Sequence, residues 1–350
     1  MASPASRNGR RYRGAVIGAG GIARQSHLPA LRGAAGVRDR VEVVALVDTA
    51  SDAPRVDGVP LLTRLEQLAE VGPLDFVDIC TPTSSHLDLT LWSLEQGYHV
   101  MCEKPVALSR AEAGRIASAA RERGLLVVPC HQYRYHPVWR QVKAWLREGA
   151  IGRWHLAELS VHRLAADPGR APPSDTPWRG TSAAGRGGVL LDHGTHLVYQ
   201  ILDVAGVPAA VNAWTGRLRH RGYDVEDTAM LILEYPERLV TSFFTWAGHA
   251  RENRARFVGE AGAIDWIGAE LRLERGGVVE RYDCSTELEK AAYHRWFAGL
   301  FAEFVAALDA GEPRAAATPY LDDIRRVAAV MEQAYEAART GCKVVVSDWT

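Results

Sequence analysis

The chain has 350 residues, which is too long for one ordinary hydrophobic core and predicts two domains. Its 41 basic and 42 acidic residues nearly cancel, so no overall positive field is available to hold a nucleic acid. No apolar run approaches the roughly 18 residues of a spanning helix, which argues against a membrane partner as well.

The N-terminal residues and the cysteines indicate the compartment. Met1–Arg10 is small, polar and basic, but no apolar stretch follows it that could form the core of a signal peptide. The five cysteines contain no C-x-x-C pair, and an odd number makes a poor disulfide framework. We therefore expect a protein of the reducing cytoplasm.

The first third of the chain alternates short apolar runs with segments of helical spacing, which predicts a parallel sheet covered by helices. Ser85 with Asp88, and Ser109 with Glu112, have the spacing of capping boxes and are expected to begin two of these helices. The expected strands are Gly14–Ile17, Val41–Val47, Phe76–Cys80, His99–Cys102 and Leu125–Cys130.

After Pro137 the pattern changes, and the order of elements predicts an α+β domain with a mostly antiparallel sheet. The segment Ala166–Gly188 is rich in Pro, Gly, Arg and Ser, which is typical of a long loop bordering a site. A helix is expected to follow that loop. The other expected helices are Val138–Arg147, Ala292–Asp309 and Tyr320–Thr340, and the expected strands are Trp154–His162, Ala210–Arg217, Thr228–Tyr235, Leu239–Trp246, Arg254–Val258, Ala263–Ile267 and Leu271–Arg275.

A glycine-rich turn follows the first expected strand and precedes a helix. Gly18, Gly20 and Ala23 match G-x-G-x-x-A, in which small residues permit the tight turn, the approach of a pyrophosphate and close packing of the helix. Gly21 and Ile22 complete the segment, whose helix N-terminus would face the phosphates. The sequence therefore predicts a dinucleotide-binding site.

Asp48 ends the second apolar run, where an acidic residue is expected to meet the hydroxyls of the adenine ribose. A carboxylate there favours NAD over NADP. Arg24 or Arg55 could bind a 2′-phosphate, so NADP stays possible. The predicted fold class is α/β, with a Rossmann doubly wound domain over residues 11–136. An α+β substrate-binding and oligomerisation domain is expected over residues 137–350, its last helix able to pack back on the first domain.

Three motifs make the sequence similar to a known family. They are Cys80–His86 with the sequence CTPTSSH, the triplet Glu103-Lys104-Pro105, and Leu191–His196 with the sequence LDHGTH. In order and spacing they resemble the glucose-fructose oxidoreductase and inositol dehydrogenase (Gfo/Idh/MocA) family. The resemblance spans the chain and implies an NAD(P)-dependent enzyme that interconverts a secondary alcohol and a ketone on a sugar, cyclitol or amino-sugar.

The chemistry of the residues is compatible with that activity. Hydride transfer from an alcohol requires a base within hydrogen-bond reach of the hydroxyl, and His196 is suited to this role. Asp192 lies four residues before it on the same helix face, where its carboxylate could orient the imidazole or hold Lys104. Lys104 follows a strand at the ligand-binding edge and would stabilise a developing alkoxide. The resemblance implies the same catalytic and substrate-binding trio.

The resemblance implies further roles. Thr81, Pro82 and His86 would border the cofactor, Glu103 would reach the nicotinamide ribose, and Trp178 and Arg179 would contact the nicotinamide end. Gln132 stands where the family usually has Asn, and it is expected at the cofactor as well. Tyr199 replaces a frequent second Asp and is expected either to contact the substrate or to pack in the structure. Pro105 is expected to follow an unusual peptide geometry.

Other interpretations stay open at this point. A metal is not expected, because His193 and His196 would point about 60° apart on a helix and a catalytic zinc needs three ligands on one centre. A redox-neutral elimination or glycoside cleavage with tightly held NAD is one alternative function, and a non-catalytic dinucleotide sensor is another. A polyol or sugar is the expected substrate, and the family resemblance implies a homodimer or homotetramer.

Overall fold

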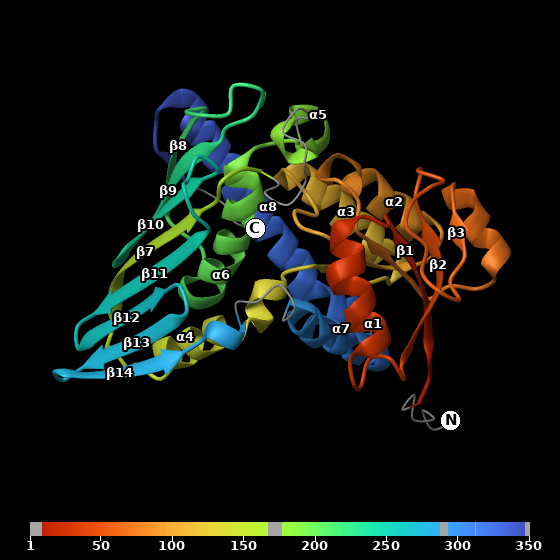
Figure 1. Ribbon diagram of the computed structural model, residues 1–350, viewed down its shortest axis with the longest axis horizontal. Helices are drawn as coiled ribbons and strands as arrows, with labels where there is room; N and C mark the ends of the chain where they lie inside the picture. Colours follow the sequence, from red (N-terminus) through yellow and green to blue (C-terminus); the bar gives the residue numbers. More distant parts are fainter. Residues whose placement is uncertain (1–8, 167–176, 288–292, 312, 347–350) are drawn as a thin grey trace.

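A computed structural model describes residues 9–166, 177–287, 293–311 and 313–346. Two sheets face each other across a layer of helices, with the smaller sheet at the N-terminal end of the chain (Figure 1). Residues 167–176 of the predicted long loop, and the expected helix start at Ala292, lie outside the described residues. Within the described part of the chain, no helix is long and apolar enough to cross a membrane.

The first sheet is parallel and has six strands in the order β3-β2-β1-β4-β5-β6. This order is that of a Rossmann fold, so the predicted fold class is confirmed. The short strand β3 is the one that the sequence pattern did not predict. The bounds are β1 Tyr12–Ile17, β2 Val41–Val47, β3 Leu61–Leu62, β4 Phe76–Ile79, β5 His99–Cys102 and β6 Val127–Pro129.

Both helices begin directly after the predicted serine, but only one of the two predicted capping boxes forms. Ser109 caps its helix, because its hydroxyl accepts the N–H of Glu112 at 3.1 Å. Ser85 makes no such bond, since a short 3-10 turn over Thr83–Ser85 precedes the helix and the Ser85 hydroxyl donates to Thr81 instead. The helices of this domain are α1 Leu28–Gly33, preceded by a π-helical turn at Ala23–His27, α2 His86–Glu95 and α3 Arg110–Arg123.

The second sheet has nine strands in the order β14-β13-β12-β11-β7-β10-β9-β8-β15, and only the β7–β10 pair is parallel. The prediction of a mostly antiparallel sheet is therefore confirmed, while β14 and β15 were not predicted. The strands are β7 Trp154–His162, β8 Ala210–Gly216, β9 Thr228–Tyr235, β10 Arg238–Thr245, β11 Glu252–Gly259, β12 Gly262–Ile267, β13 Glu270–Arg275, β14 Val278–Asp283 and β15 Val344–Val345.

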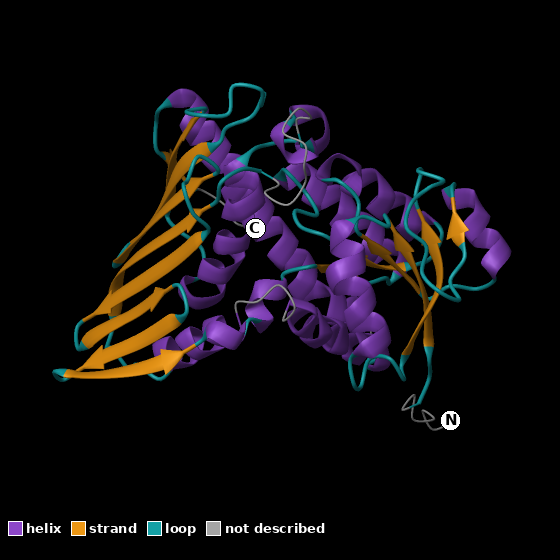
Figure 2. Ribbon diagram, viewed as in Figure 1, coloured by secondary structure: helices purple, strands orange, loops and turns teal. Residues whose placement is uncertain are grey.

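Helices cover one face of this sheet, and its other face is open (Figure 2). The helices after residue 136 are α4 Pro137–Arg147, α5 Ser182–Gly185, α6 Thr195–Ala205, α7 Tyr293–Asp309 and α8 Pro313–Thr340, with a π-helical turn at Leu190–Gly194 before α6. Of these, α7 packs on the Rossmann domain rather than on this sheet.

The two hydrophobic cores do not follow the predicted boundary at residue 137. Phe297 and Phe301 of α7, and Leu321 and Ile324 of α8, belong to the core of the Rossmann domain. Farther along α8, the side chain of Val330 belongs to the core of the second domain. The C-terminal helices therefore connect the two domains. Both α7 and α8 pack on the first domain, whereas only the last helix was predicted to do so.

Candidate active site

The glycine turn leaves space at the start of the first helix. Gly18 has a φ of +95°, and a Cβ there would lie 2.9 Å from the backbone of Cys80, so that only glycine fits. A Cβ on Gly20 or Gly21 would meet no atom within 4 Å, so the backbone is open on that side. Ala23 is fully buried against the sheet. This is the space that a pyrophosphate needs at a helix N-terminus.

Asp48 lies beside this turn, directly after β2. Its carboxylate accepts the N–H of Ala19 at 2.8 Å and that of Ala50 at 3.0 Å, which fixes it next to the glycines.

Gln132 supplies a second feature that fits a ligand, because its buried Oε1 has no hydrogen-bond partner. A buried amide oxygen without a partner is rare, and a ligand with a donor would satisfy it. The residues present thus fit a dinucleotide.

Lys104 joins the two domains at the carboxyl edge of the small sheet. It follows β5, and its bond to Pro105 is cis. Its Nζ donates to the Oδ1 of Asp192 at 2.5 Å and to the backbone oxygen of Asp192 at 2.8 Å. Of the two predicted roles for the Asp192 carboxylate, the structure therefore shows the one in which it holds the lysine.

Asp192 is ionised in these surroundings. Burial alone would raise the pKa of its carboxyl, but Lys104, His193 and Arg179 outweigh burial and hold the pKa well below its usual value. Arg179 places its Nε 3.6 Å from Oδ2, and its guanidinium lies 4.3 Å from the centre of the Trp178 ring. Trp178 and Arg179 thus lie on the Asp192 side of the site.

His196 is held by Tyr199 rather than by Asp192. Its Nδ1 lies 2.9 Å from the Tyr199 hydroxyl, which also accepts the backbone N–H of Tyr133 at 3.2 Å. Burial, followed by the charge of Lys104, lowers the pKa of His196 well below its usual value. His196 is therefore neutral at pH 7, with Nε2 as the nitrogen available for proton exchange.

Tyr199 packs inside the structure. The side chain is fully buried, its hydroxyl bonds to His196 and Tyr133, and its ring stacks on His131 with centroids 4.0 Å apart. Tyr199 therefore supports His196 from behind. The packing alternative that the sequence left open is the one observed.

Comparison with known proteins identifies the group to which this architecture belongs. Residues 12–131 match the oxidoreductase family with an NAD-binding Rossmann fold, and residues 139–265 match the GFO/IDH/MocA C-terminal domain. The D-apiose dehydrogenase of Paraburkholderia graminis is 30% identical over 273 residues, which are 75% of this chain and 68% of that protein. The chain belongs to the Gfo/Idh/MocA family. It is accordingly an NAD(P)-dependent oxidoreductase.

One further relative and one solved structure are similar over nearly the whole chain. The dTDP-3,4-didehydro-2,6-dideoxy-alpha-D-glucose 3-reductase of Actinomadura kijaniata is 29% identical, covering 98% of each chain. A solved oxidoreductase from Agrobacterium radiobacter, in complex with NAD+, L-tartaric acid and magnesium, has a TM-score of 0.82. It is 21% identical and covers 96% of this chain and 98% of its own, a likeness that concerns the fold.

In this Gfo/Idh/MocA member, His86 is not placed to contact a cofactor. It is buried, with Nδ1 2.8 Å from the backbone oxygen of Pro105 and Nε2 2.9 Å from that of Thr81. His86 therefore joins the Thr81-Pro82 loop to the turn that follows Lys104. The expectation for His86 is corrected to an indirect role, while Thr81 and Pro82 stay predicted neighbours of the cofactor.

A buried cluster beneath the glycine turn was missed by the sequence analysis. His27 lies between two carboxylates, with Nδ1 2.8 Å from Asp78 and Nε2 2.9 Å from Glu103. Burial would lower the pKa of His27, but the two carboxylates raise it to about 10. Glu103 is thus engaged with His27, and its predicted contact with the nicotinamide ribose stays a prediction. No signal near His27 in the sequence indicates this cluster.

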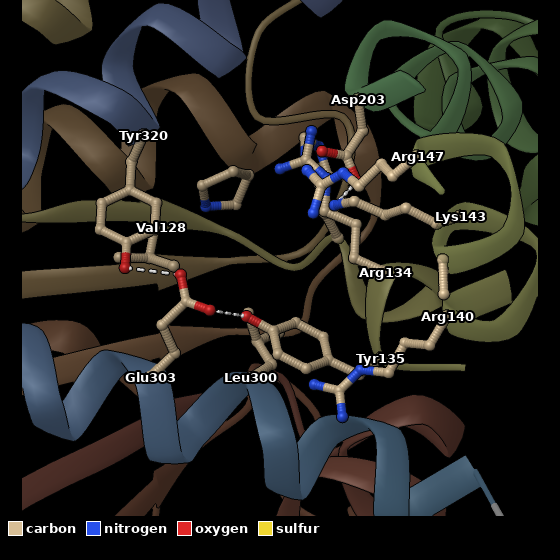
Figure 3. Close-up of a pocket in the computed structure, with 13 residues that line it drawn as sticks. Val128, Arg134, Tyr135, Arg140, Lys143, Arg147, Asp203, Leu300, Glu303 and Tyr320 are labelled. Carbon is tan, nitrogen blue, oxygen red and sulfur yellow. Dashed lines mark hydrogen bonds and ion pairs between the residues drawn. The ribbon is translucent and has the colours of Figure 1, made fainter. Parts of the chain in front are cut away.

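A cavity of about 450 Å³ is lined in part by His131, on whose ring Tyr199 stacks. Figure 3 shows Arg134, Lys143 and Arg147 gathered around Asp203 on one side of it, and Glu303 between Tyr135 and Tyr320 on the other. Most of these charges are paired within the protein. Asp323 binds both His131 and Arg134 at 2.7 Å, and Lys143 bonds to Asp203. This network fixes the elements that support Tyr199.

Proposed function

We propose that this chain interconverts a secondary alcohol and a ketone on a sugar, cyclitol or amino-sugar by hydride transfer. The observation that carries the proposal is the ion pair of Lys104 and Asp192 beside a neutral His196. Relatives named as acting on D-apiose and on a dTDP-linked keto-sugar support the substrate class. When bound, a nicotinamide would supply the hydride acceptor or donor.

The three side chains would divide the remaining work. Lys104 would donate a hydrogen bond to the substrate oxygen and stabilise negative charge as it develops there. His196 would accept the hydroxyl proton at Nε2 during oxidation and return it during reduction. The Tyr199 oxygen can accept a hydrogen bond from the Nδ1–H of that imidazole, and Asp192 orients Lys104.

Gly18, Gly20 and Asp48 would hold the dinucleotide. The Asp48 carboxylate supports NAD, because it would accept hydrogen bonds from a free ribose 2′-hydroxyl and repel a 2′-phosphate. We expect kcat/KM with NAD to exceed that with NADP by more than tenfold. A preference of that size for NADP would overturn the proposed choice of NAD and leave the proposed reaction unaffected.

The function is tested by screening polyols, sugars and keto-sugars through the absorbance of reduced nicotinamide, with Lys104→Met as the matched inactive variant. We expect turnover of at least one carbohydrate by the natural protein and a loss of roughly 100- to 1,000-fold in Lys104→Met, the scale for one lost charge-stabilising donor. An undiminished rate in Lys104→Met would contradict the proposal.

We further propose that the open face of the large sheet joins two copies of the chain. Leu156 and Leu239 are neighbours on paired strands, as are Trp214 and Met230, and all four are more than one-third exposed. Such an apolar surface favours a symmetric interface. Sedimentation at micromolar concentration is expected to show a dimer or tetramer, whereas a monomer would contradict this proposal.

A further inference from the structure

Two arginines lie where the large sheet ends near the active site. Arg163 follows β7 and is only 4% exposed. Its Nη1 donates to two backbone oxygens, that of His162 at 2.7 Å and that of Glu252 at 3.1 Å. Among the residues that the structure describes, none brings a carboxylate within 4.0 Å of this guanidinium. Arg163 is therefore a buried cation with neutral partners.

Arg251 is the second cation. It precedes β11 and is exposed, and its Nη2 donates to the Tyr293 hydroxyl at 2.5 Å. It too has no carboxylate partner within the described ranges. Burial, followed by the like charge of Arg251, lowers the pKa of Arg163. Two neighbouring cations without an anion are unfavourable in the protein alone, and a bound anion would remove the penalty.

This pair is connected to the catalytic residues through aromatic side chains. The rings of Tyr293 and Tyr133 both pack against Trp296, with centroids 4.3 and 5.4 Å from it. The Tyr133 ring in turn meets that of His196 edge-on with centroids 4.6 Å apart. The backbone N–H of Arg163 donates to the oxygen of Thr245 at 2.8 Å. The next residue, Trp246, meets the ring of His193, the neighbour of Asp192, edge-on with centroids 6.4 Å apart. The two arginines therefore border the space next to His196 and Asp192.

Charge balance decides what such a space accepts. The carboxylate of Asp192 is already paired with the ammonium of Lys104, so its charge offsets that of Arg163 only in part. A neutral sugar would leave Arg163 buried and unpaired. A carboxylate or a phosphate would accept the remaining N–H groups in the forked geometry that guanidinium groups favour.

We propose that Arg163 and Arg251 bind an anionic substituent of the substrate, so that the substrates are sugar acids or sugar phosphates rather than neutral sugars. The proposal rests on the oxidoreductase function proposed above and adds the chemical class of its substrate. Carboxylate and phosphate share the required chemistry, and the experiment separates them.

The test compares matched pairs with the NAD-loaded full chain: hexuronate with hexose, hexonate with hexitol, and hexose 6-phosphate with hexose. We expect the acidic member of at least one pair to have a kcat/KM at least tenfold higher than its neutral partner, mainly through KM. Preference for the carboxylates or for the phosphate identifies the substituent.

Variants assign the preference to the arginines. Arg251→Gln keeps the fold because the side chain is exposed, and it is expected to reduce the acid-to-neutral ratio about tenfold, whereas Arg163→Gln tests the buried partner if it folds. Arg256→Gln is the control, because Arg256 lies on β11, the strand that follows Arg251, and is exposed like Arg251 but pairs with Asp265 at 3.4 Å. It is expected to leave the ratio unchanged.

The outcomes separate the two proposals. Equal kcat/KM for acidic and neutral members would overturn the anionic substrate class and leave the oxidoreductase function intact. An acid preference that is unchanged in Arg251→Gln would have the same consequence. Turnover of no member would count against the function. Calorimetric binding to NADH-loaded protein then decides the anionic class: tighter binding of an acid than of its neutral partner supports it, and equal binding overturns it.

Discussion

Two histidines of this protein, His27 and His196, both lie in buried surroundings, but His27 is positively charged and His196 is neutral. His27 is enclosed by the carboxylates of Asp78 and Glu103, which raise its pKa to about 10 despite burial. His196 faces the ammonium of Lys104, and burial together with that charge lowers its pKa well below 6.5. Burial favours the neutral form of both imidazoles, and only the two carboxylates beside His27 reverse that effect.

The comparison predicts that His196 matters for catalysis and little for stability. In His196→Asn, kcat is expected to fall about 100- to 10,000-fold, the usual range for a lost general acid–base group. Its thermal midpoint should stay near that of the natural protein, because the side chain is partly exposed. Steady-state kinetics and thermal unfolding of one preparation measure both, and a wild-type kcat would refute the catalytic role.

The opposite result is expected for His27. In His27→Gln, two buried carboxylates lose their cation, which costs about 3–5 kcal/mol in the free energy of unfolding. Denaturant titration measures this loss, with His155→Gln, at an exposed position, as the control. A loss below 1 kcal/mol would mean that the cluster is not the buried ion pair described above.

The sequence was sufficient to predict the residues in short motifs but not the His27 cluster. The glycine turn, Asp48, Lys104 and Asp192 were predictable, because each lies in a short motif at a strand or helix end. His27 was not, because its partners Asp78 and Glu103 are 51 and 76 residues away and only the sheet brings them together.

Other differences have equally local causes. The cap predicted at Ser85 failed because a 3-10 turn redirects its hydroxyl to Thr81. Strand β14 escaped prediction because five of its six residues are exposed and no alternation of burial marks it. Arg163 gave no signal, since its burial without a carboxylate is a property of the folded sheet end.

The pH dependence of stability sharpens the comparison. Because the folded pKa of His27 is raised to about 10, its contribution to stability is fully present below the unfolded value of about 6.5 and is lost as pH rises toward 10. The thermal midpoint of the natural protein is therefore expected to fall across this window more steeply than that of His27→Gln. Parallel curves for the two proteins would contradict the raised pKa.

The smallest effect is expected at Tyr199. Tyr199→Phe removes one hydrogen bond to His196, and loss of about 0.5–1.5 kcal/mol corresponds to a two- to tenfold decrease in kcat. KM should be nearly unchanged, because the side chain is fully buried. A rise in KM with unchanged kcat would instead place Tyr199 in the substrate site.

The most direct test of the central claim is a crystal structure of the protein with NADH and a substrate or inhibitor. The account predicts that the reactive C4 of the nicotinamide faces the space bordered by Lys104 Nζ, Asp192 and His196 Nε2, with the substrate oxygen within hydrogen-bond distance of Lys104. A nicotinamide bound away from all three side chains would contradict it.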